Sequence, residues 1–489
     1  MIEDEASPPH RRSRARGKAF FSGILLSAAI FICSLTPTGT PGSPSDSPPP
    51  SLPAPPRNTS PTLSPPTDSP PAASTPTPPR PSRSAGLDKW DLWANGTQLR
   101  GANLYQRRVY PELDNGFFGP GPAGPPVTQQ DIDNLAALGA NYVNLSHPGL
   151  FTEKPPYQPD PAMQANLDAL LDMIAQADMF AVISFRTGPG RSEFTFFWDE
   201  AGTWFDESYL NNSVWADQQA QDAWAEMWAY TAAQYKDNPI VVGYDLMVEP
   251  NSNEVGSYPL DDPLDIWDPA AFYDQYGGTL YDWNQLYPDI SAAIRAVDTE
   301  TPILIGGMGY SGVDWLPYLE PTGDPRTVYT VHFYQPFSYT HQLSTTVGIT
   351  YPGFFDLDYD GAGEAFDRAW LEGRLATVEA FVQAYGVPVA VNEFGLVRWA
   401  PGAAAYLHDL MDLFELLGLN HAVWEWQPSW EPLQLIDQFN FRRGADPENH
   451  QDVDNALQDA IVAYWARNTL WPSTAGAFAH AVYLPVSAR

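Results

Sequence analysis

Hydrophobic and polar positions alternate on two length scales from residue 99 onward. Short apolar runs rich in β-branched residues occur eight times, and longer segments with apolar residues at helical spacing lie between or after them. The short runs are 99–104, 141–145, 180–185, 240–247, 302–306, 328–334, 388–393 and 421–426; the longer segments are 128–138, 161–177, 216–236, 282–298, 364–385, 402–418 and 452–468. Fully apolar strands that alternate with helices form parallel sheets. Eight such strands predict an α/β fold, a closed (β/α)₈ or TIM barrel with long loops.

The barrel prediction directs attention to the polar residues at the ends of the apolar runs. In this fold the active site lies at the carboxyl ends of the strands, so the side chains there share one mouth. The residues in these positions are Asn103, Asn144, Arg186, Glu249, His332, Tyr334, Glu393 and Trp424.

The chain before the barrel has two zones of different composition. In residues 1–35, a basic flank precedes the uncharged apolar run 19–35, which predicts a signal peptide or a retained signal anchor. Residues 36–85 hold 18 of the 50 prolines, mixed with Ser and Thr, and predict a disordered, extended linker. The catalytic barrel is expected at 86–473 and a tail at 474–489. We therefore expect a secreted protein or one anchored at the cell surface, with a possible membrane tether through the apolar run.

The net charge and the cysteine content exclude several classes of partner and of chemistry. The formal net charge of −34 disfavours nucleic acid as a partner and is compatible with a neutral substrate. The single cysteine, Cys33, lies in the apolar N-terminal run, so no disulfide and no cysteine chemistry are expected in the barrel. No glycine-rich phosphate loop follows a strand, and we expect no cofactor.

Two of the strand-end residues form a candidate catalytic pair. Glu249 follows the fourth apolar run and Glu393 ends the seventh, and a carboxylate in such a place is costly unless it faces a polar cavity. Glycoside hydrolysis requires two carboxyl groups on either side of the scissile bond. The alternative is that each acid only caps the helix that follows it. This interpretation is the weaker one, because two such acids are expected in one barrel mouth.

Six segments in the order of the chain resemble glycoside hydrolase family 5, the cellulase-like family, or a close relative in its clan of retaining (β/α)₈-barrel glycosidases. They are RGANL at 100–104, YKDNPIVVGYDLMVEPN at 235–251, AIRAVDTETPILIGG at 293–307, VHFY at 331–334, VPVAVNEFG at 387–395 and AVWEW at 422–426. Each segment is short, but together they extend over most of the predicted barrel.

The resemblance implies roles for four residues. Glu249 would be the general acid/base, and Glu393 the nucleophile of a double displacement. His332 and Tyr334 match the family's His-x-Tyr, in which the Tyr orients the nucleophile and the His contacts the sugar. The implied activity is retaining hydrolysis of β-glycosidic bonds in a neutral oligo- or polysaccharide of β-glucan or β-mannan type.

Substrate-binding residues are less uniform. Trp424 matches the Trp that forms the floor under the sugar ring, and Trp426 is the alternative if the alignment shifts. Asn103, Asn144 and Arg186 are further candidate substrate-binding residues.

This sequence departs from the family pattern at three positions. Val248 stands where the family has Asn, Asn144 lies where it has Arg, and Arg186 follows the third strand in place of its His. Two alternatives stay open: a transglycosylase with the same carboxylates, and a carbohydrate-binding barrel without turnover, for which Val248 is the main support.

One acidic stretch resembles a calcium loop. Asp356, Asp358 and Asp360 alternate before Gly361, but no two flanking helices are evident. A solvated acidic loop is the favoured interpretation, so we expect no metal in the site.

Overall fold

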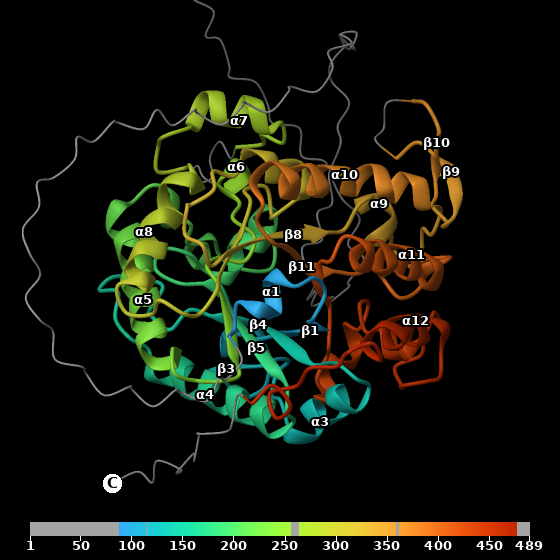
Figure 1. Ribbon diagram of the computed structural model, residues 1–489, viewed down its shortest axis with the longest axis horizontal. Helices are drawn as coiled ribbons and strands as arrows, with labels where there is room; N and C mark the ends of the chain where they lie inside the picture. The colour runs from blue at the N-terminus through green and yellow to red at the C-terminus, as the bar shows by residue number, and fades with distance from the viewer. Residues whose placement is uncertain (1–87, 115, 256–263, 358–360, 477–489) are drawn as a thin grey trace, which may run out of the picture. The chain divides into compact units, whose positions relative to one another are not determined.

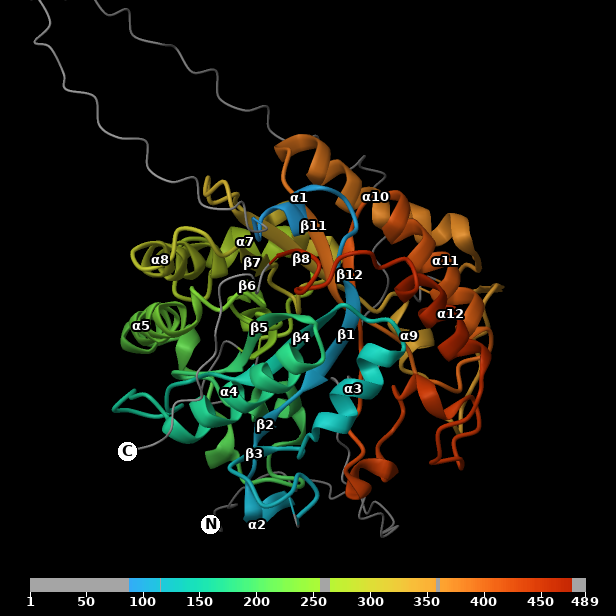
Figure 2. The same ribbon diagram turned by 60° about the horizontal axis from the view of Figure 1, so that its bottom comes forward.

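The computed structural model describes residues 88–476, except 115, 256–263 and 358–360. Eight parallel strands close into a barrel in the order β1-β12-β11-β8-β7-β6-β5-β4, so spatial order follows chain order around the ring. Figures 1 and 2 show helices outside the strands. The predicted (β/α)₈ barrel is confirmed.

Each predicted apolar run overlaps one barrel strand. The strands are β1 (Arg100–Tyr105), β4 (Tyr142–Pro148), β5 (Phe180–Thr187), β6 (Val241–Asp245), β7 (Ile303–Gly306), β8 (Thr327–Phe333), β11 (Val389–Phe394) and β12 (Asn420–Val423). Three strands end earlier than their apolar runs: β6 ends at Asp245, β8 at Phe333 and β12 at Val423. The residues after these ends turn into the barrel mouth and belong to the candidate site.

The predicted helices also form. They are α3 (Gln129–Ala137), α4 (Pro161–Gln176), α5 (Gln218–Tyr235), α8 (Trp283–Arg295), α10 (Arg368–Tyr385), α11 (Ala403–Leu416) and α12 (Ala456–Trp465). Thr128 caps α3 as expected: its side chain accepts from the Asp131 N–H, and the Asp131 side chain accepts from the Thr128 N–H. Between β7 and β8, where no helical pattern was found, the crossover contains the 3₁₀ helix Val313–Tyr318.

Shorter helices and two small hairpins lie before β1 or in the loops of the barrel. They are α1 (Asp91–Ala94), α2 (Pro111–Asp114), α6 (Ser252–Val255), α7 (Pro269–Tyr276), α9 (Phe337–Thr340) and the antiparallel hairpins β2 (Arg107–Arg108) with β3 (Ala123–Gly124) and β9 (Gly353–Phe355) with β10 (Glu364–Phe366). The long loop after β5 holds the 3₁₀ helix Glu193–Glu200.

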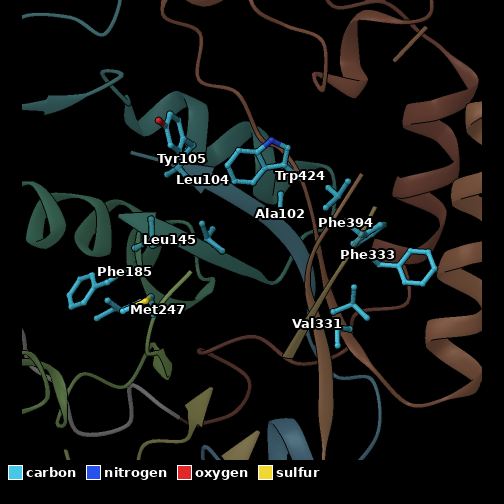
Figure 3. Close-up of a cluster of buried hydrophobic side chains, with 14 of the residues drawn as sticks. Ala102, Leu104, Tyr105, Leu145, Phe185, Met247, Val331, Phe333, Phe394 and Trp424 are labelled. Carbon is cyan, nitrogen blue, oxygen red and sulfur yellow. The ribbon is translucent and has the colours of Figure 1, made fainter. Parts of the chain in front are cut away.

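The apolar core has two parts. The larger part includes buried side chains such as Leu104, Leu145, Val331 and Phe394, some of which appear in Figure 3. The smaller part includes Leu92 and Trp93 of α1, whose indole donates to the Val242 carbonyl at 2.9 Å. Helix α1 thus packs against the residues at the amino ends of the strands, and the functional side chains gather at the opposite end.

Several predictions fall on residues that the structure does not describe. The export segment 1–35, the linker 36–85, Asp358, Asp360 and most of the tail 474–489 lie outside the described residues. Within the described part of the chain, no helix is long and apolar enough to cross a membrane.

Candidate active site

Glu249 and Glu393 come together at the barrel mouth. Glu249 lies in the loop after β6 and Glu393 is the penultimate residue of β11, and both are buried. One carboxylate oxygen from each and a ring nitrogen of His332 all lie within 4.8 Å of one another. This spacing is compatible with the separation of about 5–5.5 Å between the carboxyl groups of retaining glycosidases.

His332, near the end of β8, lies between the two carboxylates. Its Nδ1 is 2.9 Å from Glu249 Oε1 and 3.7 Å from Glu393 Oε2. Burial alone would lower the pKa of His332, but the carboxylates of Glu393, Glu249 and Asp245 outweigh it and raise the pKa to about 9. The ring is therefore an imidazolium near neutral pH, with Nδ1 donating to Glu249.

Glu393 is aimed by Tyr334, the residue that follows β8. The Tyr334 hydroxyl donates to Glu393 Oε1 at 2.8 Å. Burial raises the pKa of Glu393 to about 7, and the Glu249 charge adds to the rise, while His332, Arg186 and the Tyr334 hydrogen bond act against it. Removing a stabilising donor would therefore make this carboxylate harder to ionise.

The backbone of Glu249 is held in an unusual conformation. Its φ of 54° lies in the left-handed region, which residues other than Gly rarely adopt. The guanidinium of Arg191, from the loop after β5, donates to the Val248 carbonyl and to the Glu249 carbonyl, each at 2.7 Å. Arg191 does not stand out in the sequence, because its role depends on backbone carbonyls that are 57 and 58 residues away along the chain.

A buried polar layer lies beneath Glu393. The side-chain amides of Asn103 and Asn144 both donate to the Asn392 carbonyl, at 2.9 and 3.2 Å, and Asn144 also donates to Asn103 Oδ1 at 2.7 Å. Asn103 is fully buried and Asn144 nearly so. This corrects the expectation that these two amides bind substrate: their donors are already bonded inside the barrel.

The same layer continues to Asp245 at the end of β6. The Asn392 side chain donates to Asp245 Oδ2 at 2.6 Å, and Ser184 donates to Asn144 Oδ1 at 2.6 Å. Burial raises the pKa of Asp245 to about 6, although His332 and hydrogen bonds from Ser184 and Asn392 oppose the rise. Asn392, the residue before Glu393, is thus fixed by both its carbonyl and its side-chain amide.

Arg186 and Trp424 meet at one side of the mouth. The Arg186 guanidinium lies 5.0 Å from the centre of the Tyr105 ring and 5.9 Å from that of Trp424, and it forms an ion pair with Glu193 at 3.1 Å. Figure 3 shows the Tyr105 and Trp424 side chains next to each other, with ring centres 5.8 Å apart. The structure therefore brings these two predicted substrate-binding residues together near the carboxylates.

Trp426, the alternative to Trp424, lies elsewhere. It is buried, its indole donates to the Asp131 carbonyl at 3.0 Å, and Arg442 covers its ring at 4.2 Å. Its ring thus packs against α3 and the 3₁₀ turn Phe441–Arg443, so the structure places Trp424, and not Trp426, at the mouth.

A third carboxyl, Glu425, approaches the site without having been predicted. It lies between the two Trp residues just discussed, after a cis Trp424–Glu425 peptide. Burial raises the pKa of Glu425 to about 8, the charge of Glu393 adds to the rise, and Arg186 opposes it. Glu425 therefore keeps its proton near neutral pH, as a neutral neighbour of Glu393.

The groups that could hold a metal ion are the site residues themselves. Among the described residues, Glu249, His332 and Glu393 are the one set with ligand atoms close enough. An imidazolium has no lone pair for a metal, and the raised pKa of His332 therefore disfavours this use of the trio near neutral pH. Asp356, the described member of the acidic stretch that resembles a calcium loop, accepts a hydrogen bond from the Gly361 N–H at 3.1 Å.

The chain is similar to a known family and to several known enzymes. The model of the cellulase family, glycosyl hydrolase family 5, matches residues 97–429. Endoglucanase C of Acetivibrio thermocellus is 21% identical over 333 residues, which cover 62% of this chain and 84% of that protein. Endoglucanase 3 of Fibrobacter succinogenes is 27% identical over 247 residues, 45% of this chain and 34% of that protein.

A solved structure shows the same fold. Endoglucanase Cel5A of Thermotoga maritima superposes with a TM-score of 0.53 at 16% identity, over 77% of this chain and all of that chain. The family match extends over more than half of the chain and includes Glu249, His332, Glu393 and Trp424. This protein belongs to the cellulase family, glycosyl hydrolase family 5, and is a retaining glycoside hydrolase.

Proposed function

We propose that this enzyme hydrolyses β-glucan by double displacement, with Glu393 as the nucleophile and Glu249 as the general acid/base. The main support is the convergence of the two carboxyl groups and His332 within 4.8 Å at the barrel mouth. The proposed substrate class rests on relatives that are named endoglucanases.

In the first step Glu393 attacks the anomeric carbon while Glu249 protonates the departing oxygen. Tyr334 and His332 stabilise the charge on Glu393 before attack. Glu249, which has given its proton to the leaving group, is then a carboxylate and accepts a proton from the water that hydrolyses the Glu393 ester. Trp424 offers an apolar ring face for the sugar, with Arg186 beside it.

Sugar release by the purified protein tests the proposal. The panel contains β-glucan, β-mannan and xylan, and Glu393→Gln serves as the inactive control. We expect release from β-glucan and a loss of at least about 10³-fold in the variant. Release from mannan alone would replace the substrate class, whereas equal binding by both proteins without release would support a carbohydrate-binding barrel.

A mechanism-based label tests the role of Glu393 directly. A 2-deoxy-2-fluoro β-glycoside with a good leaving group forms a slow covalent intermediate only on a working nucleophile. We expect one label per chain, on the peptide that contains Glu393, and no label on Glu393→Gln. A label on Glu249 or Glu425 would reverse the assignment.

We also propose that the enzyme is exported. The support is the basic flank followed by the uncharged run 19–35. Cell fractionation of the full chain and of a chain without residues 1–35 tests it: the full chain should be found outside the cytoplasm and the shortened one inside. Equal retention of both in the cytoplasm would contradict export.

A further inference from the structure

The loop that carries Glu249 is held from several directions. On one side, the Val248 N–H donates to the Phe185 carbonyl of β5 at 2.9 Å. On the other, the Tyr310 N–H donates to the Pro250 carbonyl at 3.0 Å. Between these two anchors the chain passes through the left-handed conformation of Glu249, which costs on the order of 1–3 kcal/mol for a residue other than Gly.

Arg191 bonds the peptide groups at this turn. It is fully buried, and its two terminal nitrogens donate to the Val248 and Glu249 carbonyls, each at 2.7 Å. Hydrogen bonds from a charged donor are about twice as strong as neutral ones, and the planar fork of a guanidinium fixes both acceptors relative to each other. Phe196 lies over the guanidinium, 4.9 Å from ring centre to Cζ, which limits its movement.

The tip of Glu249 is restrained separately from its backbone. His332 Nδ1 donates to Glu249 Oε1, which sets the direction of the carboxyl but not the position of Cα. A displacement of about 1 Å at a reacting group can lower a rate on the order of 10²-fold, so the position of the backbone matters for proton transfer.

We propose that Arg191 is a positioning residue for proton transfer: its guanidinium clamps the carbonyls of Val248 and Glu249 and thereby places the Glu249 carboxyl at the leaving-group oxygen. This inference rests on the proposed role of Glu249 as acid/base. It predicts that loss of the clamp harms the steps that need Glu249 and spares attack by Glu393.

Leaving-group dependence separates these steps. A dinitrophenyl group departs without protonation, whereas an unsubstituted phenoxide needs the general acid. In the full chain, Arg191→Gln should lower kcat/KM for a phenyl β-cellobioside on the order of 10²-fold, but that for the dinitrophenyl β-cellobioside by no more than about threefold. Arg191→Lys, which keeps a charged donor, should restore part of the loss.

Azide provides a second measurement. Turnover of the glycosyl-enzyme by water needs base assistance from Glu249, whereas azide attacks the anomeric carbon unaided, forms the β-glycosyl azide and releases the Glu393 carboxylate. We expect azide to raise kcat of Arg191→Gln on the dinitrophenyl substrate severalfold, with β-glycosyl azide as product, and to leave the wild type unchanged.

Two controls make the outcome decisive. Arg100→Gln removes another buried Arg at the amino end of β1, where it bonds Glu415 and Asn468, and should lower stability without changing the ratio of the two kcat/KM values. Glu249→Ala should show the full leaving-group dependence and azide rescue. If it does not, the acid/base assignment fails. If Glu249→Ala behaves as expected but Arg191→Gln lowers kcat/KM for both substrates by the same factor, or leaves both values unchanged, Arg191 has only a structural role.

Discussion

The phenol of Tyr334 is one of the groups that favour the ionised form of Glu393, the proposed nucleophile. Its hydrogen bond to Glu393 stabilises the charged carboxylate and so opposes the burial that raises the pKa of Glu393 to about 7. In Tyr334→Phe this donor is lost, so the acidic limb of the kcat/KM profile should move to higher pH by about one unit.

The profile is measured between pH 4 and 9 on the same substrate for both proteins. Tyr464→Phe is the matched control, because the Tyr464 hydroxyl donates to the His408 carbonyl on the outer helices. An unmoved acidic limb in Tyr334→Phe would show that the hydrogen bond does not tune Glu393.

The pKa of His332 implies a pH-dependent stability. Because the folded-state pKa is raised to about 9 from 6.5, the imidazolium stabilises the fold below pH 6.5, and this contribution is lost as the pH rises through 9. The free energy of unfolding of the wild type relative to His332→Gln should therefore fall between pH 6.5 and 9, on the order of 1–3 kcal/mol.

Denaturant unfolding of both proteins at several pH values in this window measures the difference. A constant difference would mean that His332 is already neutral at pH 7. A difference that grows with pH would reverse the assigned sign of the His332 contribution.

At the residue scale, the sequence predicts the groups whose chemistry is visible in one position. Glu249 and Glu393 stand out because a carboxylate at the end of a buried strand is expensive without a function. Arg191 and Glu425 do not stand out, because a loop Arg and a Glu between two Trp residues are ordinary in sequence. Their importance arises from burial and from partners far along the chain.

At the element scale, strand β11 is irregular where it presents Glu393, the proposed nucleophile. Its pairing with β8 changes register between Ala390 and Glu393, and its pairing with β12 between Val391 and Phe394. The Asn392 carbonyl in this irregular segment accepts a hydrogen bond from the side-chain amide of Asn103. An irregularity of this kind re-aims side chains, and here the buried carbonyl of Asn392 is satisfied by a buried amide.

Removal of that amide should loosen this irregular segment. Asn103→Ala leaves the Asn392 carbonyl with fewer donors, so we expect a loss of about 1–3 kcal/mol in stability and a fall in kcat that exceeds any rise in KM.

Asn141→Ala is the matched control: Asn141 is also fully buried and donates to two backbone carbonyls, but at the amino end of β4. It should lose similar stability and keep its kcat. Equal kcat values for the two variants would argue against the positioning role of Asn103.

The alternation of apolar runs and helical segments predicts the strands and helices well, because burial of each element leaves a periodic pattern. It does not predict the register changes in β11, nor the amides of β1 and β4 that bond the Asn392 carbonyl there, because these partners meet only in the closed barrel. It also misassigns Asn103 and Asn144, because a polar residue at a strand end can point into the barrel as well as into the cleft. Sequence alone does not distinguish these two directions.

At the scale of the whole molecule, the net charge of −34 should influence which polymers reach the cleft. A strongly negative surface repels a polyanion over a distance set by the Debye length, about 30 Å at 0.01 M salt and about 8 Å at 0.15 M. A neutral polymer experiences no such repulsion. Because kcat/KM includes the encounter step, the effect should appear there and not in kcat.

The test compares an uncharged β-glucan with its carboxymethylated form at low and moderate salt. We expect kcat/KM on the carboxymethylated polymer to rise severalfold between 0.01 and 0.15 M NaCl, while the value on the neutral polymer changes by less than about twofold. A parallel response of both polymers would show that salt acts on the enzyme itself. A fall on the charged polymer would mean that local cations such as Arg186, which lies over Tyr105 at the mouth, govern the approach of substrate more strongly than the net charge does.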